Sequence, residues 1–250
     1  MAQDSFESAS RPHSALAACG LPPSPFRPRL KPGGSTAEIT SGGKSVPSVP
    51  SVKGSVFASV VEDVLKSLAR GSVRREQLGR WLRPEDIALL DEKIGVSSWY
   101  PISAYTHMGE LLRDVEGGGN NEYLRQCGRQ TARRLLEAGL YSQLEYLHRA
   151  EVGKTSGDRA RFEAFGRDLR LLTTISASIL SFSRWAMKPD PDHDRQYLIE
   201  VSEAKDVPEV LCWRSDGFIN EMATEHGEAD LWNWWRPRQD LVLFRMTRKL

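Results

Sequence analysis

The closing sixty residues constrain the fold most, because their hydrophobic pattern changes from strand to helix and back to strand. Tyr197, Ile199 and Val201 alternate with polar residues, which is the period-two pattern of a half-buried strand. A helical segment from about Val207 to Thr224 follows, and then a tryptophan-rich strand joined to a last strand by a charged turn at 236–240. This order predicts a β-α-β-β unit that closes a small antiparallel sheet.

Residues 1–52 differ in composition from the remainder of the chain. They hold eight of the fourteen prolines, together with many serines and two glycine pairs. Such a segment cannot bury enough apolar surface to offset the loss of chain entropy on folding. We therefore predict a disordered tail over 1–52 and a single α+β ligand-binding-like domain over 53–250. A lipoprotein-like box at Leu16–Cys19 lacks the basic start and apolar stretch of a secretory signal, so we interpret it as a chance match.

Helical spacing dominates the chain between the predicted tail and the closing strands. The pattern predicts several amphipathic helices, and one of them, from about Glu122, carries Gly128 in its middle. Glycine there costs roughly 1 kcal/mol relative to alanine, so we expect close packing against a neighbour, or a ligand, at this position. The predicted fold class is α+β: a helical N-terminal half packed on a small antiparallel sheet, with the C-terminal β-α-β-β unit.

Charge, apolar run lengths and cysteine usage exclude several classes of protein. The net charge of +1 gives no global field for nucleic acid, and acidic residues interrupt the arginines between Arg70 and Arg83, so nucleic-acid binding is only an alternative. No apolar run reaches the ~18 residues of a membrane span. Three widely spaced cysteines predict neither a disulfide framework nor a zinc site, and they favour a reducing cytoplasm.

No catalytic or metal-binding motif stands out. Gly153-Lys-Thr155 lacks the earlier glycine of a phosphate-binding loop, because His148 occupies that position. The loop Asp190–Asp194 offers carboxylates and an imidazole, which we interpret as a polar turn rather than a metal site. Cys127 falls on the apolar stripe of a helix, where thiols are usually inert. We predict no catalytic residue and no metal ligand, with an enzyme based on Cys127 or on this loop as the alternative.

Three tryptophans crowd the penultimate strand. Trp232 and Trp234 should share one face of it, and Trp235 should lie on the other. Rings of this kind more often cover the helices behind a sheet than form a recognition surface, but here both faces carry a large ring. We keep these three residues as a candidate interaction surface for a protein partner or a second copy of the chain.

Short motifs along the chain resemble a known superfamily. Four segments are similar to the conserved helices and closing hairpin of 4-vinyl reductase-like domains: the helix 123–134, the segment 212–222, the turn 236–240 and the strand 241–247. That superfamily also includes haem-nitric-oxide-binding domains and the TRAPP subunits of Golgi transport. A myxobacterial family of unknown function, tied to fruiting-body development, has a pattern that resembles Lys53-Gly-Ser-Val-Phe57, Trp99-Tyr-Pro101 before a helix, and the helices with Gly128-Arg129 and Gly217-Phe218. The resemblance implies an α+β fold that forms a small-molecule pocket or a dimer surface in signalling proteins.

The chain departs from that superfamily at the positions that carry cofactors. The cysteines around the final hairpin of 4-vinyl reductase domains are missing, with only Cys212 nearby, so zinc is not carried over. The haem-binding branch has a proximal histidine with a Tyr-x-Ser-x-Arg motif, which is not found here. From the sequence we therefore expect no cofactor, with haem and zinc both disfavoured.

These observations predict a non-enzymatic cytoplasmic sensory or scaffold domain that binds a small apolar ligand or a protein partner in bacterial developmental signalling. The alternatives are a homodimeric interaction module without a ligand and a nucleic-acid-binding regulator. Pockets between helices and a sheet are usually apolar with a few polar anchors. The predicted lining is Tyr105, Met108, Cys127, Gly128 and Trp185, with Arg129 and Arg184 as the anchors.

Overall fold

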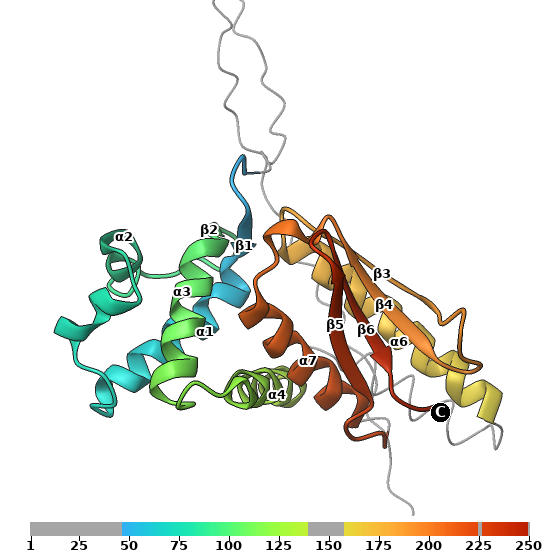
Figure 1. Cartoon of the computed structure of the whole chain (residues 1–250). Coiled ribbons are helices and arrows are strands. Elements are labelled where there is room, and N and C mark those ends of the chain that lie inside the picture. Colours follow the sequence, from blue (N-terminus) through green and yellow to red (C-terminus); the bar gives the residue numbers. More distant parts are fainter. Residues whose placement is uncertain (1–46, 140–157, 225–226, 250) are drawn as a thin grey trace, which may run out of the picture. The chain divides into compact units, whose positions relative to one another are not determined.

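The computed structural model describes residues 47–139, 158–224 and 227–249. Within these ranges the fold is α+β, as predicted: helices come first, and an antiparallel sheet closes the C-terminal half (Figure 1). Residues 1–46, with the Leu16–Cys19 box, and the segment around Gly153 lie outside the described residues. Ser51 and Val52, predicted as tail, instead pair in a strand, and Val52 is fully buried.

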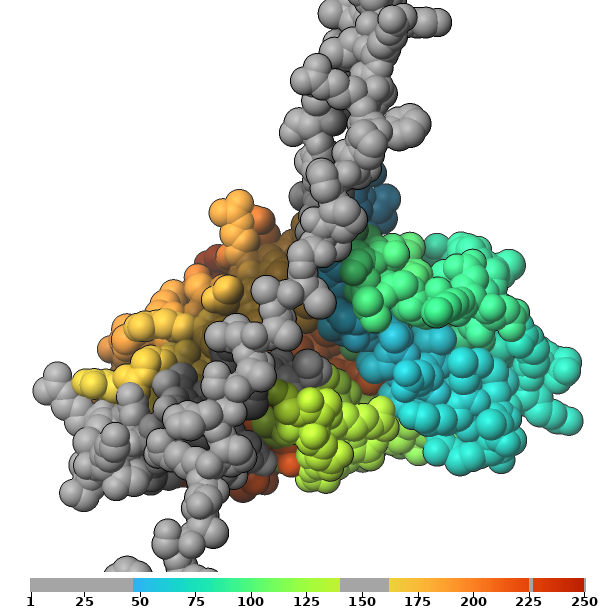
Figure 2. Space-filling view, turned by 180° about the vertical axis from the view of Figure 1, so that it is seen from behind, coloured from blue at the N-terminus to red at the C-terminus, as the bar shows by residue number. Residues whose placement is uncertain are grey.

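The N-terminal half consists of helices and one short two-stranded sheet. Its elements are β1 (Ser51–Lys53), α1 (Gly54–Ala69), the 3-10 turn η1 (Arg75–Arg80), α2 (Pro84–Ala88), β2 (Trp99–Pro101), α3 (Ile102–Val115) and α4 (Asn121–Glu137). β1 and β2 pair antiparallel, with Ser51 opposite Pro101. α1 packs on α3 and α3 on α4, and the three helices are neighbours in Figure 2.

Local sequence rules place the buried face and the ends of these helices. In α1, Phe57, Val60 and Val64 recur at helical spacing and are fully buried. Gly71 has a φ of +75°, a left-handed conformation that glycine adopts without steric cost, so α1 stops where the sequence predicts. α4 begins after Asn120, whose side chain accepts a hydrogen bond from a backbone amide of the first turn.

The C-terminal half places two long helices beside a four-stranded sheet. Its elements are α6 (Asp158–Ile179), β3 (Arg184–Pro189), β4 (Tyr197–Ser202), the 3-10 turn η2 (Ala204–Asp206), α7 (Glu209–Thr224), β5 (Trp232–Arg238) and β6 (Leu241–Met246). The strand order is β3-β4-β6-β5, with every neighbouring pair antiparallel. α7 and the β5–β6 hairpin confirm the predicted β-α-β-β unit. No helix among the described residues is both long and apolar enough to cross a bilayer.

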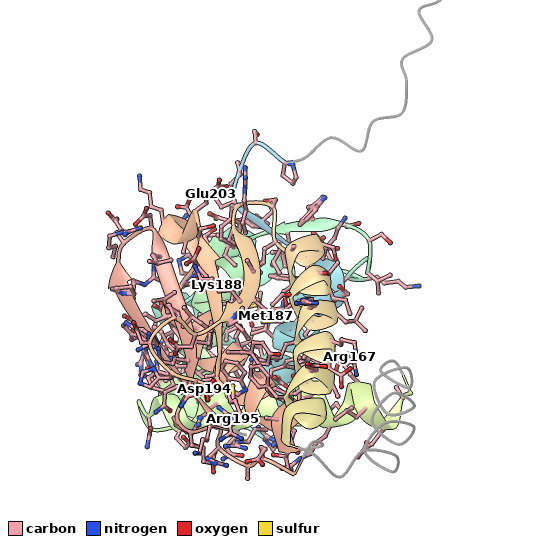
Figure 3. All side chains as sticks on the ribbon, turned by 90° about the vertical axis from the view of Figure 1, so that its right-hand side faces the viewer. Arg167, Met187, Lys188, Asp194, Arg195 and Glu203 are labelled. Carbon is pink, nitrogen blue, oxygen red and sulfur yellow. The ribbon has the colours of Figure 1, made fainter. Side chains whose placement is uncertain are left out.

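One face of this sheet carries the large apolar side chains. Ile199 of β4 lies opposite Phe244 of β6 and Met187 of β3, so these three side chains share the inner face. Ile199 and Phe244 are at most 2% exposed, which confirms the alternation predicted for β4. Lys188 lies on the outer face, where its ammonium pairs with Glu200 at 2.5 Å. Figure 3 shows α6 running beside β3, with Met187 and Lys188 marked on the strand.

β3 is a strand that the sequence pattern did not reveal. Pro189 and Pro191 predict the end of the helical half, whereas residues 184–189 form an edge strand of the sheet. Half-buried Trp185 and Met187 alternate with exposed neighbours. Two apolar residues give a weak period-two signal, and Pro189 is tolerated because it ends a strand at the edge of the sheet.

Candidate functional site

A narrow apolar hollow lies between α6 and α7. Its cavity volume is about 10 Å³, roughly the room of one water molecule, and the side chains that line it are Phe165, Asp168, Leu169, Leu172, Ile219, Met222 and Ala223. The α6 residues recur at i, i+3, i+4 and i+7, and the α7 residues at i, i+3 and i+4, so each helix contributes one face. The hollow forms where these two faces meet. Asp168 is a buried carboxyl group in its wall, only 4% exposed.

Trp232 of β5 is held between the two helices that form this hollow. Its ring stacks on Phe165 of α6, with centroids 6.3 Å apart and planes inclined by 25°. Its backbone N–H donates to Oδ1 of Asn220 at 2.8 Å, and its carbonyl accepts from Asn220 Nδ2 at 3.0 Å. Asn220 lies in α7 and is fully buried. In the sequence, Asn220 is a polar residue inside the apolar stretch of the predicted helix, and this feature could have indicated the contact.

A second cluster surrounds Arg214, where α1, α3, α4 and α7 meet. The guanidinium of Arg214, 5% exposed, donates to Asp63 at 3.1 Å and lies 6.0 Å from the centre of the Tyr105 ring. Cys127 also interacts electrostatically with Arg214. The structure thus brings together Tyr105 and Cys127 of the predicted lining. Met108, on the same helix as Tyr105, is fully buried.

Burial controls the acidity of this cluster. It raises the pKa of the Cys127 thiol and of the Tyr105 phenol, although the Arg214 charge opposes both shifts. Cys127 is therefore held as a neutral thiol rather than as the thiolate that acts as a nucleophile. These surroundings fit the inert thiol predicted for Cys127.

Gly128 of α4 lies directly against the backbone of α7. A methyl group on Gly128 would overlap the carbonyl oxygen of Arg214, and one on Gly217 would overlap the carbonyl oxygen of Arg125. The two glycines thus allow the helix backbones to approach each other closely. Of the two alternatives for Gly128, neighbour packing is what the structure contains, and no room for a ligand is left at this position.

Arginines of α4 flank the glycine contact and pair with acidic residues of α7 and beyond it. We call these six residues the α4–α7 charge ladder: Arg125, Arg129, Arg133, Asp216, Glu221 and Asp230. Arg125 pairs with Asp216 at 2.5 Å, and Arg133 makes two hydrogen bonds to Glu221, at 2.6 and 3.1 Å. Arg129 pairs with Asp230 and lies 3.8 Å from Glu221. Arg129, predicted to anchor a ligand, therefore links α4 to Glu221 of α7 and to Asp230.

Arg184 and Trp185 lie in another part of the protein from Tyr105. The Arg184 side chain is 78% exposed and pairs with Glu203 at 3.0 Å, so its charge faces solvent rather than a pocket. Trp185 stacks on Phe244 in the sheet, with centroids 5.8 Å apart. β3, which carries both residues, packs on β4 and α6, whereas α3 packs on α1, α4 and α7. The predicted lining is thereby divided between two regions.

The acidic loop after β3 is organised by Arg245 of β6. Arg245 pairs with the buried Asp190 at 2.8 Å and with Asp192 at 2.8 Å. The Trp235 ring lies over the same guanidinium, 5.3 Å away. In the part of the chain that the structure describes, no group of three or more His, Cys, Asp or Glu side chains is placed to hold a metal.

The three tryptophans of β5 lie on the faces that the sequence predicts. Trp232 is fully buried on the inner face, and Trp234 packs edge-on against Trp213 of α7, with centroids 5.3 Å apart. Trp235 is half-buried on the outer face beside Arg245. The use of these rings as an interaction surface stays a prediction.

Solved H-NOX proteins resemble this chain in fold. The Fe(II) unliganded H-NOX protein from K. algicida matches 79% of this chain and 98% of its own, with 9% identity and a TM-score of 0.49. An H-NOX protein from S. oneidensis in the Fe(II)NO ligation state matches 78% and 97%, with 16% identity and a TM-score of 0.42. A Cs H-NOX mutant with 4-cyano-L-phenylalanine matches 79% and 98%, with 13% identity and a TM-score of 0.44. No protein-family model and no curated protein matches the sequence.

The expectation that haem is disfavoured is corrected by these neighbours. H-NOX proteins are the haem-nitric-oxide-binding proteins of the superfamily named above, and nearly their whole length matches this chain.

The described residues do not assign an axial ligand for a haem iron. The walls of the hollow, as far as the structure describes them, contain no histidine, cysteine or tyrosine. His107 pairs with Asp86 at 2.7 Å and His193 with Asp190 at 3.3 Å, both away from these walls. His13, His148 and His226 lie outside the described residues.

Proposed function

We propose that this chain is a cytoplasmic sensory domain that binds a small apolar ligand between α6 and α7, where the hollow widens from its volume of about 10 Å³ to admit the ligand. The observation that carries the proposal is the pairing of two apolar helix faces around a space with one buried carboxyl group, Asp168. Small-molecule sites commonly combine an apolar lining with a few polar groups.

The biological setting is a separate part of the proposal. Bacterial developmental signalling, and membership of the myxobacterial family, rest on the short motifs at 53–57, 99–101, 128–129 and 217–218. Ligand binding beside α7 suits a signalling role, because α7 also contacts α4 and β5. A ligand that moves α7 would therefore change the contacts that α7 makes with both halves of the domain.

Native mass spectrometry of the full chain, purified from cells supplied with a haem precursor, tests the proposal. We expect a small molecule that is retained in the native ion and released on unfolding. An absorbance spectrum of the same sample reports haem directly through its Soret band. A bare dimer would favour the homodimeric interaction module instead.

Two variants in which leucine replaces a buried alanine test where the ligand binds. Ala223→Leu fills the hollow and should abolish retention, because Ala223 lines the space. Ala132→Leu is the matched control, since Ala132 is equally buried in α4 but does not line the hollow. Both changes overpack the core and should lower the free energy of unfolding by about 1–3 kcal/mol. Retention by the Ala223→Leu protein would place the ligand elsewhere.

A further inference from the structure

Asp216 is a buried carboxyl group of α7 whose two oxygens face two different donors. Its exposed fraction is 2%. Oδ2 lies 2.5 Å from Nε of Arg125 on α4, and Oδ1 accepts from Nδ2 of Asn220 at 3.0 Å. Neither the guanidinium nor the amide N–H₂ can accept a hydrogen bond. A proton that binds to Asp216 must therefore displace one of these two donors.

Asn220 cannot turn its amide group without breaking its contact with the sheet. Its Oδ1 accepts from the backbone N–H of Trp232 at 2.8 Å, and its Nδ2 donates to the Trp232 carbonyl at 3.0 Å. Because a backbone N–H can only donate, the atom that faces it must be the amide oxygen, which fixes the orientation of the side chain. A turned amide would leave two buried backbone groups unpaired, which is destabilising. Oδ2 of Asp216 is therefore the oxygen that can take the proton.

Arg125 has a second carboxylate within reach. Its Nη2 lies 3.5 Å from Oδ1 of Asp230, which belongs to the connection between α7 and β5. The Asp230 side chain is 64% exposed and the Arg125 side chain 19%, so the guanidinium lies between a buried carboxyl group and a solvated one. A small rotation of Arg125 exchanges one partner for the other without leaving its charge unpaired.

The charged groups that face Asp216 come from α4 and from the connection before β5. Burial raises the pKa of Asp216 to about 6. Arg125 and Arg129 of α4 act to lower it, and Glu122 of α4 acts to raise it. Asp230 pairs with both arginines and so weakens their hold on Asp216. The carboxyl group therefore changes its charge near neutral pH, beside a second acceptor for Arg125.

We propose that Arg125 is a proton-controlled switch between two carboxylate partners, Asp216 inside the α4–α7 contact and Asp230 at the surface. While Asp216 is ionised, Arg125 joins α4 to α7. When Oδ2 of Asp216 takes a proton from solvent, Arg125 moves to Asp230, and a water molecule in its former place accepts from the new O–H group. α7 stays bound to β5 through Asn220. The switch does not depend on a ligand between α6 and α7.

NMR spectroscopy of the ¹⁵N,¹³C-labelled full chain between about pH 4.5 and 7.5 tests the switch. The Nε–H resonance of Arg125, assigned by its loss in Arg125→Lys, reports the partner of the guanidinium. The ¹³C resonance of the Asp216 carboxyl group reports its charge. We expect the two resonances to titrate together, with a midpoint of about 6. The amide resonance of Trp232 should move far less, because Asn220 keeps its place.

Asp216→Asn and Glu221→Gln are matched variants, because each replaces a buried carboxylate of α7 that faces arginines of α4. In Asp216→Asn, the Arg125 resonance should remain at its low-pH position throughout the titration. In Glu221→Gln, it should titrate as in wild type, because Glu221 binds Arg129 and Arg133 instead.

Three results would overturn the switch: an Asp216 carboxyl group that stays ionised over the whole range, an Arg125 resonance that stays constant while Asp216 titrates, and an Arg125 resonance that still titrates in Asp216→Asn. A Trp232 amide that moves as far as the Arg125 resonance would also overturn it, because Asn220 would then be the donor that gives way. If Asp216→Asn fails to fold, the wild-type midpoints of Arg125 and Asp216 still decide. Coincident midpoints support the switch, and separate midpoints overturn it.

Discussion

At the scale of single residues, buried charge is the feature that organises the helical half. Arg214 lies among four helices with one carboxylate partner, Asp63, and the ring of Tyr105 nearby. Removing a charge from water is costly unless it is paired, so this arginine holds its neighbours in a defined arrangement. The same low-dielectric surroundings set the chemistry of Cys127 and Asp216.

Cys127 should be unreactive in the folded protein. Burial raises the pKa of its thiol, which reduces the thiolate that reacts with alkylating reagents. In a Cys19→Ser background at pH 7, we expect Cys127 to be labelled by iodoacetamide only at the rate of unfolding. Cys212 is the internal comparison, because burial raises its pKa to about 12. Rapid labelling of Cys127 alone, measured by mass spectrometry, would restore the enzyme alternative.

Asp216 should make stability depend on pH in an unusual direction. Burial raises the pKa of this carboxyl to about 6, even though the Arg125 guanidinium beside it acts in the opposite direction. The folded protein therefore binds this proton more tightly than the unfolded chain does. The contribution is fully present below about pH 4 and is lost, by about 3 kcal/mol, as the pH rises through 6.

Urea unfolding between about pH 4 and 7 measures this effect. Asp216→Asn should lack the loss of stability over that range. Asp230→Asn is the control, because the pKa of Asp230 is shifted in the opposite direction: Arg129 holds it below its usual value. Any effect of this variant on stability should therefore appear at lower pH. An identical pH profile for Asp216→Asn and wild type would contradict the assignment.

At the scale of elements, the backbones of α4 and α7 pack closely together at Gly128 and Gly217. Gly128 and Gly217 face the carbonyl groups of the opposite helix, and the α4–α7 charge ladder flanks them. The glycines determine how near the helices come, and the ion pairs determine their register.

Gly128→Ala and Gly217→Ala should each destabilise the protein by at least about 3 kcal/mol. The added methyl group meets backbone, which cannot rotate away as a side chain can, so the helices must separate. Gly79→Ala is the control, because nothing lies within 4 Å of a methyl group there. Urea midpoints measure the three changes. A gain in stability for Gly128→Ala from its higher helix propensity would mean that the contact is not this close.

At the scale of the whole described domain, α7 connects the two halves. It packs on α4 on one side, and Asn220 ties it to Trp232 of β5 on the other. The end of α6 also joins the N-terminal half, because the Ser181 amide donates to the Ser51 carbonyl at 3.0 Å. The halves therefore share structural elements rather than a surface that can separate.

We expect this domain to unfold in a single cooperative transition. Far-ultraviolet circular dichroism follows the helices, and fluorescence follows the tryptophans, among them Trp232 in the sheet. The two urea curves should coincide, as they do for a two-state domain. Asn220→Ala leaves the N–H and carbonyl of Trp232 unpaired and should lower the stability by about 2–4 kcal/mol. Separate transitions in the wild-type protein would show that the halves fold independently.

Local patterns determined most of the elements of this protein. The alternation of Tyr197, Ile199 and Val201 predicted β4, and Gly71 marked the end of α1, because strand periodicity and left-handed glycine depend on near neighbours. Tertiary structure alone decided which long-range partners meet. Gly128 packs against the carbonyl of Arg214, Arg129 pairs with Asp230, and Phe165 of α6 stacks on Trp232 of β5, and no spacing within one segment encodes such pairs. Hydrophobic periodicity describes each helix separately. It could not predict that one face of α6 and one face of α7, which are remote in sequence, line the hollow together.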